Sequence, residues 1–514
     1  MARSAGSRNW FSRLTPQAKV MVTVVVMLLL AGAASWTYTD RANQTAAAEI
    51  LERMCGPDIE RIDEQCIGVT DGSYLFHPIF ANVQERIADE NAWVRTQPSY
   101  VSVAFLNPLT ATGDLAIDDL RNQLEGAYTA QRRVNHSAVV GDFRLPIQLL
   151  LANEGDTQNQ WQPVVDRLVE MTDGDSPLVA VVGMGSSFIQ TQQAAMELSK
   201  HRIPMVGALF NADELEYSNI PGLIRVTPSV QDYIKSLGGY LDSRPHLDSA
   251  ILVRDTNADF GVDLFTKALS DNLDREMREM RGLIKFPTQN FEGGSLANTK
   301  PDLVGNITPN ICAAAAQGLD IVFYAGRRGD LGDFLDAMED RVCRSTPLTV
   351  MTGTDPQDHL MGREDQLRVA NLTVVFPGRT DVSGWNQNVP GTPEHYPAFR
   401  QAFEEAGFNL EHLDDRSVMT HDAMLTAVKA VRLAAPGRSA TPPGGSTASR
   451  VFGQLLNLNG FNTVPGASGP LIFSHREPGA GNPQNKQVLV FQVPQVTDGP
   501  SRQVGPTYST SSGP

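Results

Sequence analysis

Short apolar runs alternate with segments of helical periodicity through most of this chain. Runs such as Tyr100–Leu106 and Leu178–Gly183 are largely apolar, as expected for strands buried on both faces of a sheet. The segments between them, such as Leu115–Val134, place apolar residues on one helical face. This alternation predicts a mostly parallel sheet covered by helices on both faces. Because the series occurs twice, on either side of a crossing segment at Leu223–Ser229, we predict an α/β protein with two lobes.

The same patterns give the expected elements of both lobes. Strands are predicted at 100–106, 145–152, 178–183, 203–209, 249–254, 283–287, 320–325, 348–352, 372–376 and 488–493. Helices are predicted at 79–94, 115–134, 161–171, 188–200, 233–241, 260–272, 311–316, 331–342, 396–406, 417–434 and 449–456. A loop rich in Pro, Gly and Ser is expected at 436–447, and a polar disordered tail at 495–514.

The N-terminal region has a different pattern. Val20–Ala34 is apolar apart from Thr23, and residues 35–38 extend it to about the length that a bilayer requires. Basic residues without any acid precede it, namely Arg3, Arg8, Arg13 and Lys19. By the positive-inside rule we predict a cytoplasmic tail at 1–19, a transmembrane anchor at 20–38 and a juxtamembrane segment at 39–98, with the body extracytoplasmic. A cleaved signal peptide is the alternative, because the small residues Ala31–Ala34 resemble a cleavage site.

Length and charge narrow the classes of function. The chain has 514 residues, too many for one ordinary core, which favours two or three domains. Its net charge of -16 argues against nucleic acid or an anionic membrane surface as a partner. No nucleophile and base can be paired from the spacing of the motifs, so we do not expect an enzyme, and we predict no catalytic residue, metal or cofactor.

The four cysteines suit an oxidising compartment. Cys55 and Cys66 bracket a short loop, and Cys312 and Cys343 flank one predicted strand. An even number outside the cytoplasm favours disulfides. We predict the bonds Cys55–Cys66 and Cys312–Cys343, the most local of the three possible pairings, with four free buried thiols as the alternative.

Several short motifs occur in an order that resembles a known family. They are VVGMGSS at 181–187, IPMVGAL at 203–209, LIRVTPSVQDY at 223–233, Asp255 followed by Asp259–Gly261, IVFYAGRRGDL at 321–331 and SGPLIF at 468–473. Over about residues 99–493 the chain resembles the type 1 periplasmic-binding-protein superfamily, and most of all the branched-chain amino-acid receptors of ABC transporters. The resemblance implies two Rossmann-like lobes joined by a multi-strand hinge. Lobe one would hold 99–226 and 376–485, and lobe two 227–375 and 486–494.

The resemblance also implies a ligand cleft between the lobes. Ser186 and Ser187 would lie at a helix N-terminus, where hydroxyls and backbone amides can hold a carboxylate. The residues expected to line the cleft are Asn107, Pro108, Leu109, Thr110, Ser186, Ser187, Ala208, Leu209, Phe210, Asp232, Phe260, Tyr324, Arg327, Arg328, Thr354 and Asp355.

The chain departs from the amino-acid receptors at three places. The acid that usually follows the Pro-Ser of the crossing is replaced by Val230, and Asp232 comes two residues later. Leu209 and Phe210 stand where a small hydroxyl residue is usual, and Arg327–Arg328 replaces an aromatic residue. Because arginine pairs bidentately with carboxylate or phosphate, these changes favour an anionic or partly apolar ligand over an ordinary amino acid.

The residues interpreted as ligand-binding could also have a purely structural role. Ser186 and Ser187 could be N-cap residues only, since serine is favoured there for its hydroxyl. Arg327 and Arg328 could be solvated loop residues paired with Asp330 or Asp333, and Phe260 could belong to a core.

Two hypotheses of function follow. The first is a membrane-anchored extracytoplasmic receptor for a small anionic or amino-acid-like ligand, with an ABC permease as its partner and no contact with nucleic acid. The second is an envelope protein-interaction module whose ligand cleft is vestigial. A cleft lined by convergent polar groups would favour the receptor, whereas a collapsed or wholly apolar cleft would favour the module.

Overall fold

The computed structural model describes residues 15–16, 54–111, 117–294, 307–360, 362–435, 447–473, 479–495, 503–505 and 507–510. The predicted anchor at 20–38 lies outside the described residues, as do the basic tail apart from Thr15 and Pro16 and the loop at 436–447 apart from Thr447. None of the helices within these ranges is both long and apolar enough to cross a membrane.

Two sheets organise the described chain. The first has the strand order β1-β2-β3-β5-β4-β6-β7-β8, antiparallel from β1 to β5 and parallel from there on. All residues of β4, β5 and β6 are buried, which explains their apolar sequences. Its strands are β1 Met54–Gly56, β2 Ile59–Ile62, β3 Gln65–Thr70, β4 Val101–Asn107, β5 Ile147–Asn153, β6 Leu178–Gly183, β7 Met205–Gly207 and β8 Leu223–Arg225.

The second sheet has the order β10-β9-β11-β12-β13-β16-β17. It is parallel from β10 to β13, and β16 and β17 join it antiparallel. Its strands are β9 Ala250–Asp255, β10 Gln289–Phe291, β11 Ile321–Ala325, β12 Leu348–Thr352, β13 Leu372–Gly378, β16 Gln487–Val493 and β17 Tyr508–Ser509. A two-stranded ribbon, β14 Val464–Gly466 with β15 Gly469–Leu471, lies apart from both sheets.

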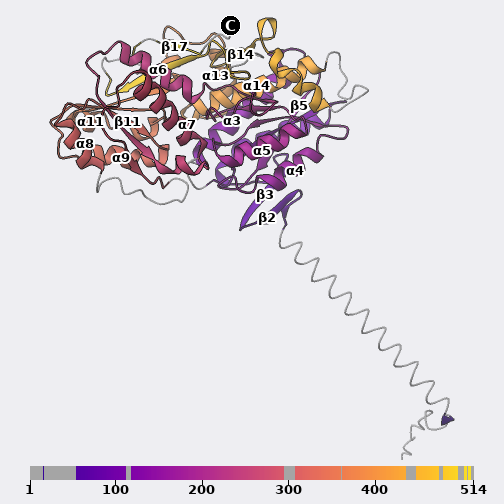
Figure 1. Cartoon of the computed structure of the whole chain (residues 1–514). Helices are drawn as coiled ribbons and strands as arrows, with labels where there is room; N and C mark the ends of the chain where they lie inside the picture. Colours follow the sequence, from indigo (N-terminus) through magenta and orange to yellow (C-terminus); the bar gives the residue numbers. More distant parts are fainter. Residues whose placement is uncertain are drawn as a thin grey trace, which may run out of the picture.

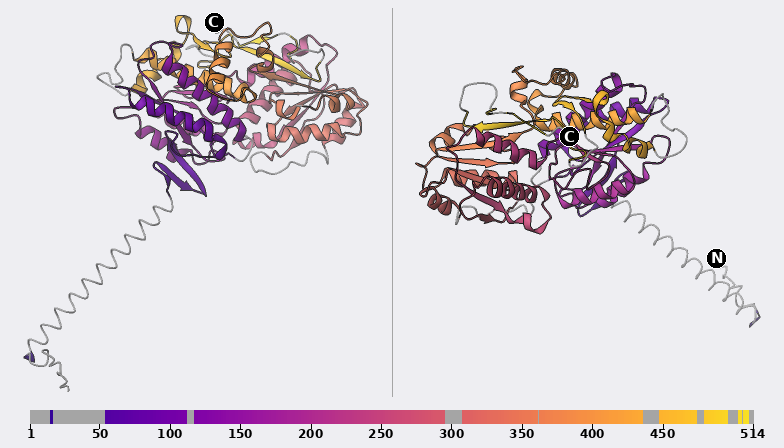
Figure 2. Two further views of the ribbon diagram at one scale, coloured as in Figure 1. Left: turned by 180° about the vertical axis from the view of Figure 1, so that it is seen from behind. Right: turned by 45° about the horizontal axis from the view of Figure 1, so that its top comes forward.

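Helices cover both faces of each sheet, so each sheet forms the centre of a lobe (Figures 1 and 2). On the first lobe the helices are α2 Ala81–Arg95, α3 Ile117–His136, α13 Tyr396–Glu405, α14 Asp415–Ala434 and α15 Thr447–Phe452 on one face, with α4 Trp161–Glu170 and α5 Ile189–Lys200 on the other. On the second they are α6 Val230–Asp242 and α7 Leu264–Leu273 on one face, with α8 Ile307–Ala315, α9 Arg328–Glu339 and α11 Glu364–Val369 on the other. Shorter elements are α10 Gln357–Leu360, α12 Val382–Trp385 and the π-helix Asp274–Met280.

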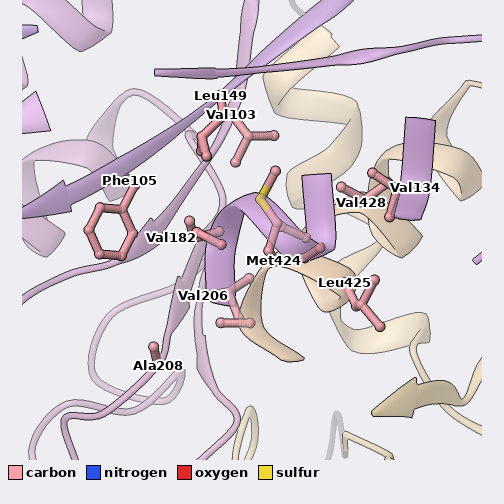
Figure 3. Packing of buried hydrophobic residues seen from close by; sticks show 14 of the residues in the cluster. Val103, Phe105, Val134, Leu149, Val182, Val206, Ala208, Met424, Leu425 and Val428 are labelled. Atoms are coloured by element: carbon pink, nitrogen blue, oxygen red, sulfur yellow. The ribbon is translucent and has the colours of Figure 1, made fainter. Parts of the chain in front are cut away.

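Helix α14 lies at the centre of the first lobe (Figure 3). Figure 3 shows buried Met424 of this helix towards Val103, Val182 and Val206 of the sheet, and buried Val428 beside Val134 of α3. Full burial of side chains of this size is worth about 1.5 to 3 kcal/mol each. This packing ties the late segment 396–473 to the first sheet, so the first lobe contains two separate stretches of the chain.

The chain crosses between the lobes at several neighbouring points. It passes from β8 into α6, from β13 back to α13 and α14, and from β15 to β16. These crossings lie in different parts of the sequence and connect the two lobes.

The boundaries of two predicted elements are corrected. The strand expected at 283–287 is a single bridge between Ile284 and Ala250, because the next two amides both donate to the Ala250 carbonyl and end the ladder. The strand in this part of the chain is β10, which begins at Gln289, after the predicted segment. The helix expected from residue 260 begins at Leu264, since Gly261 has a left-handed backbone (φ 66°) and Asp263 caps the helix.

Both ends of the described body are more ordered than predicted. Residues 54–98 do not form a separate juxtamembrane segment, because β3 pairs with β5 and extends the first sheet. The β2–β3 hairpin projects from the first lobe on the side away from the C-terminus (Figure 1). In the tail that was expected to be disordered, Tyr508–Ser509 pairs with β16.

The predicted disulfides are confirmed. Cys55 bonds to Cys66 across 11 residues, and Cys312 bonds to Cys343 across 31. The first bond closes the projecting hairpin, and the second ties α8 to the segment that follows α9. Each bond therefore joins cysteines of a single lobe.

Candidate functional site

A cleft with a volume of about 140 Å³ lies between the lobes. Both lobes supply its walls, and most of the lining residues follow the carboxyl ends of parallel strands. In open α/β sheets this is the edge where ligands bind. The lining residues are Asp119, Gly185, Ser186, Ser187, Leu209, Phe210, Asn211, Tyr233, Phe265, Arg327, Arg328, Gly353, Thr354, Asp355, Pro377, Gly378, Arg379 and Arg416.

Half of the predicted cleft residues are brought together there. They are Ser186, Ser187, Leu209, Phe210, Arg327, Arg328, Thr354 and Asp355. Each follows β6, β7, β11 or β12; the ends of β6, β11 and β12 match the prediction, whereas β7 ends at Gly207, two residues earlier than predicted. The rule that loops after parallel strands form the site therefore holds for these residues.

The two serines are used differently from the prediction. Helix α5 is capped by Phe188 without any side-chain bond, so neither serine is its N-cap. The Ser186 amide donates to Gln158 Oε1 (3.0 Å), which removes it as a ligand donor. The Ser187 hydroxyl accepts from the amides of Asn211 (3.1 Å) and Ala212 (3.2 Å), and so fixes the loop after β7.

Two polar side chains in the cleft have no protein partner in the described part of the chain. They are the Ser186 hydroxyl and the Asn211 side-chain amide. Leu209, Phe210 and Phe265 supply apolar surface beside them. A hydroxyl, an amide and apolar walls can bind a small molecule that has both polar and apolar parts.

Arg327 is neither solvated nor free for a ligand. Its Nε and Nη2 donate to the two carboxylate oxygens of Asp263, at 2.7 and 2.8 Å. Nη2 also donates to the Ser187 carbonyl (3.0 Å), and the guanidinium lies 3.8 Å from the centre of the Phe188 ring. Both charged side chains are almost completely buried.

The other cleft arginines form a second charged cluster. Arg328 pairs with Asp119, which also accepts from Arg416 Nε at 3.0 Å. Arg379 and Arg416 both pair with Asp415, whose carboxylate lies at the start of α14. Arg328 is thus paired across the lobes and is not a solvated loop residue.

The pKa values in this cluster follow from burial and ion pairing. Burial acts to raise the pKa of Asp415, but Arg379 and Arg416 outweigh it and lower that pKa. Burial acts to lower the pKa of Arg379, but Asp415 and Asp355 raise it above its usual value. Asp414, beside Asp415, has a raised pKa because it is buried and next to a like charge. The cluster therefore keeps its arginines charged and its positive charge internally balanced.

The remaining predicted residues lie outside the cleft, which corrects the prediction for them. Tyr324 is stacked between Phe291 and Phe334 in the second lobe's core, and Ala208 lies in the first lobe's core. Asp232 forms a capping box with Ser229 at the start of α6. Phe260 belongs to neither cleft nor core, because it is 75% exposed.

The end of β4 and the loop after it are also absent from the cleft lining. The residues concerned are Asn107, Pro108, Leu109 and Thr110. Asn107 is buried beneath Gly183, and the Thr110 hydroxyl donates to Gln65 Oε1 (2.8 Å) in the hairpin. The hairpin that was expected to be juxtamembrane thus occupies this end of the first sheet.

Several cleft residues were missed by sequence reasoning. Pro377, Gly378 and Arg379 end or follow β13, so the strand-end rule would have found them. Asp119 and Arg416 lie in the first turns of α3 and α14, and only the packing of these helices brings them to the cleft. No sequence motif marks that approach.

Two α/β lobes, several crossings and a cleft at the strand ends define the type 1 periplasmic-binding-protein fold. The structure is similar to an ABC transporter substrate-binding protein from Desulfitobacterium hafniense in complex with Leu, with a TM-score of 0.56 and 16% identity, covering 79% of this chain and 100% of that one. It is also similar to a solute-binding protein of an ABC transporter from Rhodopseudomonas palustris in complex with p-hydroxybenzoic acid, with a TM-score of 0.57 and 15% identity over 80% of this chain and 98% of that one.

A leucine-binding protein from Thermotoga maritima gives a TM-score of 0.53 at 15% identity, covering 79% of this chain and 99% of that one. No protein-family model and no curated protein matches the sequence. At sequence identities this low, the similarity shows a shared fold only. The ligands named for these proteins are therefore not assigned to this chain.

Proposed function

We propose that this protein is a membrane-anchored extracytoplasmic receptor that binds a small solute between its lobes and serves an ABC-type transporter. The observation that carries the proposal is the cleft, which both lobes line at the carboxyl ends of their strands. A solute that contacts both lobes binds the closed conformation more tightly than the open one, and so shifts the protein towards closure. No bond is made or broken in this function.

The paired charges bear on the class of solute. All four arginines of the cleft already contact carboxylates of the chain, namely those of Asp119, Asp263 and Asp415. A ligand anion would have to displace one of these carboxylates, which favours a solute without net charge over the anionic ligand expected from the sequence. Polar contacts would come from Ser186 and Asn211, and apolar contacts from Leu209, Phe210 and Phe265.

A solute panel tests this function directly. Thermal unfolding would be followed with aliphatic amino acids, hydroxybenzoates, neutral amides and small dicarboxylates, and positives would be measured by calorimetry. A solute at a hundred times its Kd stabilises the native state by about 2.7 kcal/mol. If no member shifts the transition and no small molecule co-purifies, the receptor function is wrong. The internally paired charges would then support the interaction module with a vestigial cleft.

Replacing Asn211 by alanine is expected to weaken solute binding about tenfold, because one side-chain hydrogen bond is worth about 1 kcal/mol or slightly more. Its side chain has no protein partner in the described chain, so the melting temperature of the unliganded protein should change little. Calorimetry with the best solute of the panel measures the effect. Asn310→Ala, on the exposed surface of α8, is the matched control. Unchanged affinity in Asn211→Ala would exclude this residue from the site.

Anchoring is tested separately from binding. The full chain is expected to sediment with membranes and to be released by detergent but not by concentrated salt, because the apolar segment at 20–38 is held by burial and not by charge. A variant with two arginines in place of Val25 and Leu28 should fail to remain in the membrane fraction. Release of the unaltered protein by salt would contradict anchoring, and a processed N-terminus in mass spectra would indicate the cleaved signal peptide.

A further inference from the structure

The two lobes touch along a strip beside the cleft. Phe188 of the first lobe and Asp263 of the second form an antiparallel bridge. The Ile189 amide donates to the Val262 carbonyl at 2.9 Å, and the Phe265 amide donates to the Ser187 carbonyl at 3.3 Å. These are backbone contacts between the loop after β6 and the start of α7, so they exist only while the lobes lie together.

Arg327 lies at the centre of this strip. Its bidentate pair with Asp263 is internal to the second lobe, whereas its bond to the Ser187 carbonyl and its contact with the Phe188 ring reach the first. The side chains of Arg327 and Asp263 are only 6% and 1% exposed. A buried, bidentate and stacked arginine differs from a surface ion pair, whose contribution to stability is close to zero.

We propose that Arg327, held by Asp263, is a latch that keeps the lobes closed through the protein's own groups. The inference rests on the proposed lobe closure and assigns its regulation. Asp263 fixes the guanidinium, because its carboxylate also caps α7 by accepting from the Phe265 and Thr266 amides. Nη2 of the arginine then also donates to the Ser187 carbonyl, and one face of the guanidinium lies against the Phe188 ring.

The latch makes closure less dependent on the solute. When the lobes part, the Ser187 carbonyl loses its charged donor, the Phe188 ring loses its cation, and water reaches the ion pair. Arg327 therefore sets the ratio of closed to open protein and does not bind the solute. A solute that binds the closed form gains apparent affinity in proportion to that closed fraction.

Distances between spin labels on the two lobes test the latch without any solute. Labels at Gln193→Cys on α5 and Ala313→Cys on α8 report lobe separation, since both positions are exposed. The unaltered chain is expected to show one dominant short distance. Arg327→Lys, which keeps the charge but loses the fork and the stacking, should lower the closed-to-open ratio at least tenfold.

A second variant guards against the effect of leaving Asp263 buried and unpaired. Asp263→Asn combined with Arg327→Gln removes the ion pair but keeps a good N-cap for α7. Arg363→Gln is the matched control, because within the described residues the ion pairs of Arg363 are with Asp336 and Glu339 of the same lobe. If both latch variants fold and keep the distance distribution of the unaltered chain, the latch is wrong. Since the measurement uses no solute, a negative solute panel leaves its result unaffected.

Discussion

Replacing Glu154 by glutamine is expected to raise the free energy of unfolding at pH 7 by about 3 kcal/mol. Glu154 directly follows β5 and is almost completely buried, and one of its carboxyl oxygens has no partner in the described residues. Burial raises the pKa of Glu154 to about 8, although Gln158 acts in the opposite direction. At neutral pH the Glu154 carboxyl is therefore protonated in the native state, and it loses this proton when the chain unfolds.

The sign of the pH dependence follows from these two pKa values. The folded pKa lies above the ordinary value of 4.5, so the stability that Glu154 contributes is complete below that value and is lost as pH rises to about 8. The unaltered protein should become less stable across this window, and Glu154→Gln should lack that part of the slope. Urea unfolding at several pH values measures both effects.

An exposed glutamate provides the control for Glu154. Glu404→Gln on α13 changes the same chemical group at the surface and is expected to leave the unfolding curve nearly unchanged. A Glu154→Gln protein that is no more stable at pH 7, or that keeps the full pH slope, would show that the native carboxyl is ionised. The variant also shows whether a change at Glu154 reaches the cleft, because the neighbouring Gln158 accepts a hydrogen bond from the amide of the cleft residue Ser186.

The sequence was sufficient for the fold and for half of the cleft. The alternation of apolar runs and helical segments gave the central strands of both sheets, since strands buried on both faces leave a strong signal. The loops after β6, β7, β11 and β12 then followed from one topological rule. The prediction was wrong where the sequence pattern was weak. Ile284 has the apolar character of a strand residue, but the amides of the next two residues donate to a single carbonyl and no strand forms there.

The rest of the cleft depends on contacts between distant parts of the chain. Asp119 and Arg416 meet only because α3 packs against α14, nearly three hundred residues later in the sequence. Arg327 was predicted to face a ligand, but its partner Asp263 and its neighbour Phe188 come from separate loops. An arginine in a loop after a strand has the same sequence signature whether it binds a solute or holds two lobes together.

Replacing Asp422 by asparagine should have the largest effect on stability, a loss of about 3 to 5 kcal/mol. This carboxylate is completely buried in α14 and accepts from the amides of Ala467 (2.7 Å) and Ser468 (2.9 Å), from the Ser468 hydroxyl and from His421 Nδ1 (2.9 Å). Asparagine keeps one acceptor oxygen and turns two donor hydrogens towards groups that are themselves donors.

The stability lost in Asp422→Asn should exceed what the number of broken hydrogen bonds suggests, because Lys486 is also affected. It is 3% exposed, and its ammonium donates to the Ser468 carbonyl (2.7 Å) and hydroxyl. Burial lowers the pKa of Lys486 to about 8, while Asp422 acts to raise it. Without the carboxylate the buried amine should be neutral at pH 7, and its bonds to Ser468 should weaken.

A double-mutant cycle separates the charge from the packing. Asp422→Asn, Lys486→Gln and the combined variant would be compared with the unaltered protein by urea unfolding at one pH. Since Ser468 joins the two residues, the combined loss should be smaller than the sum of the single losses by about 1 to 3 kcal/mol. Losses that add to within about 0.5 kcal/mol would mean that Asp422 stabilises the loop at Ala467–Ser468 independently of the buried lysine.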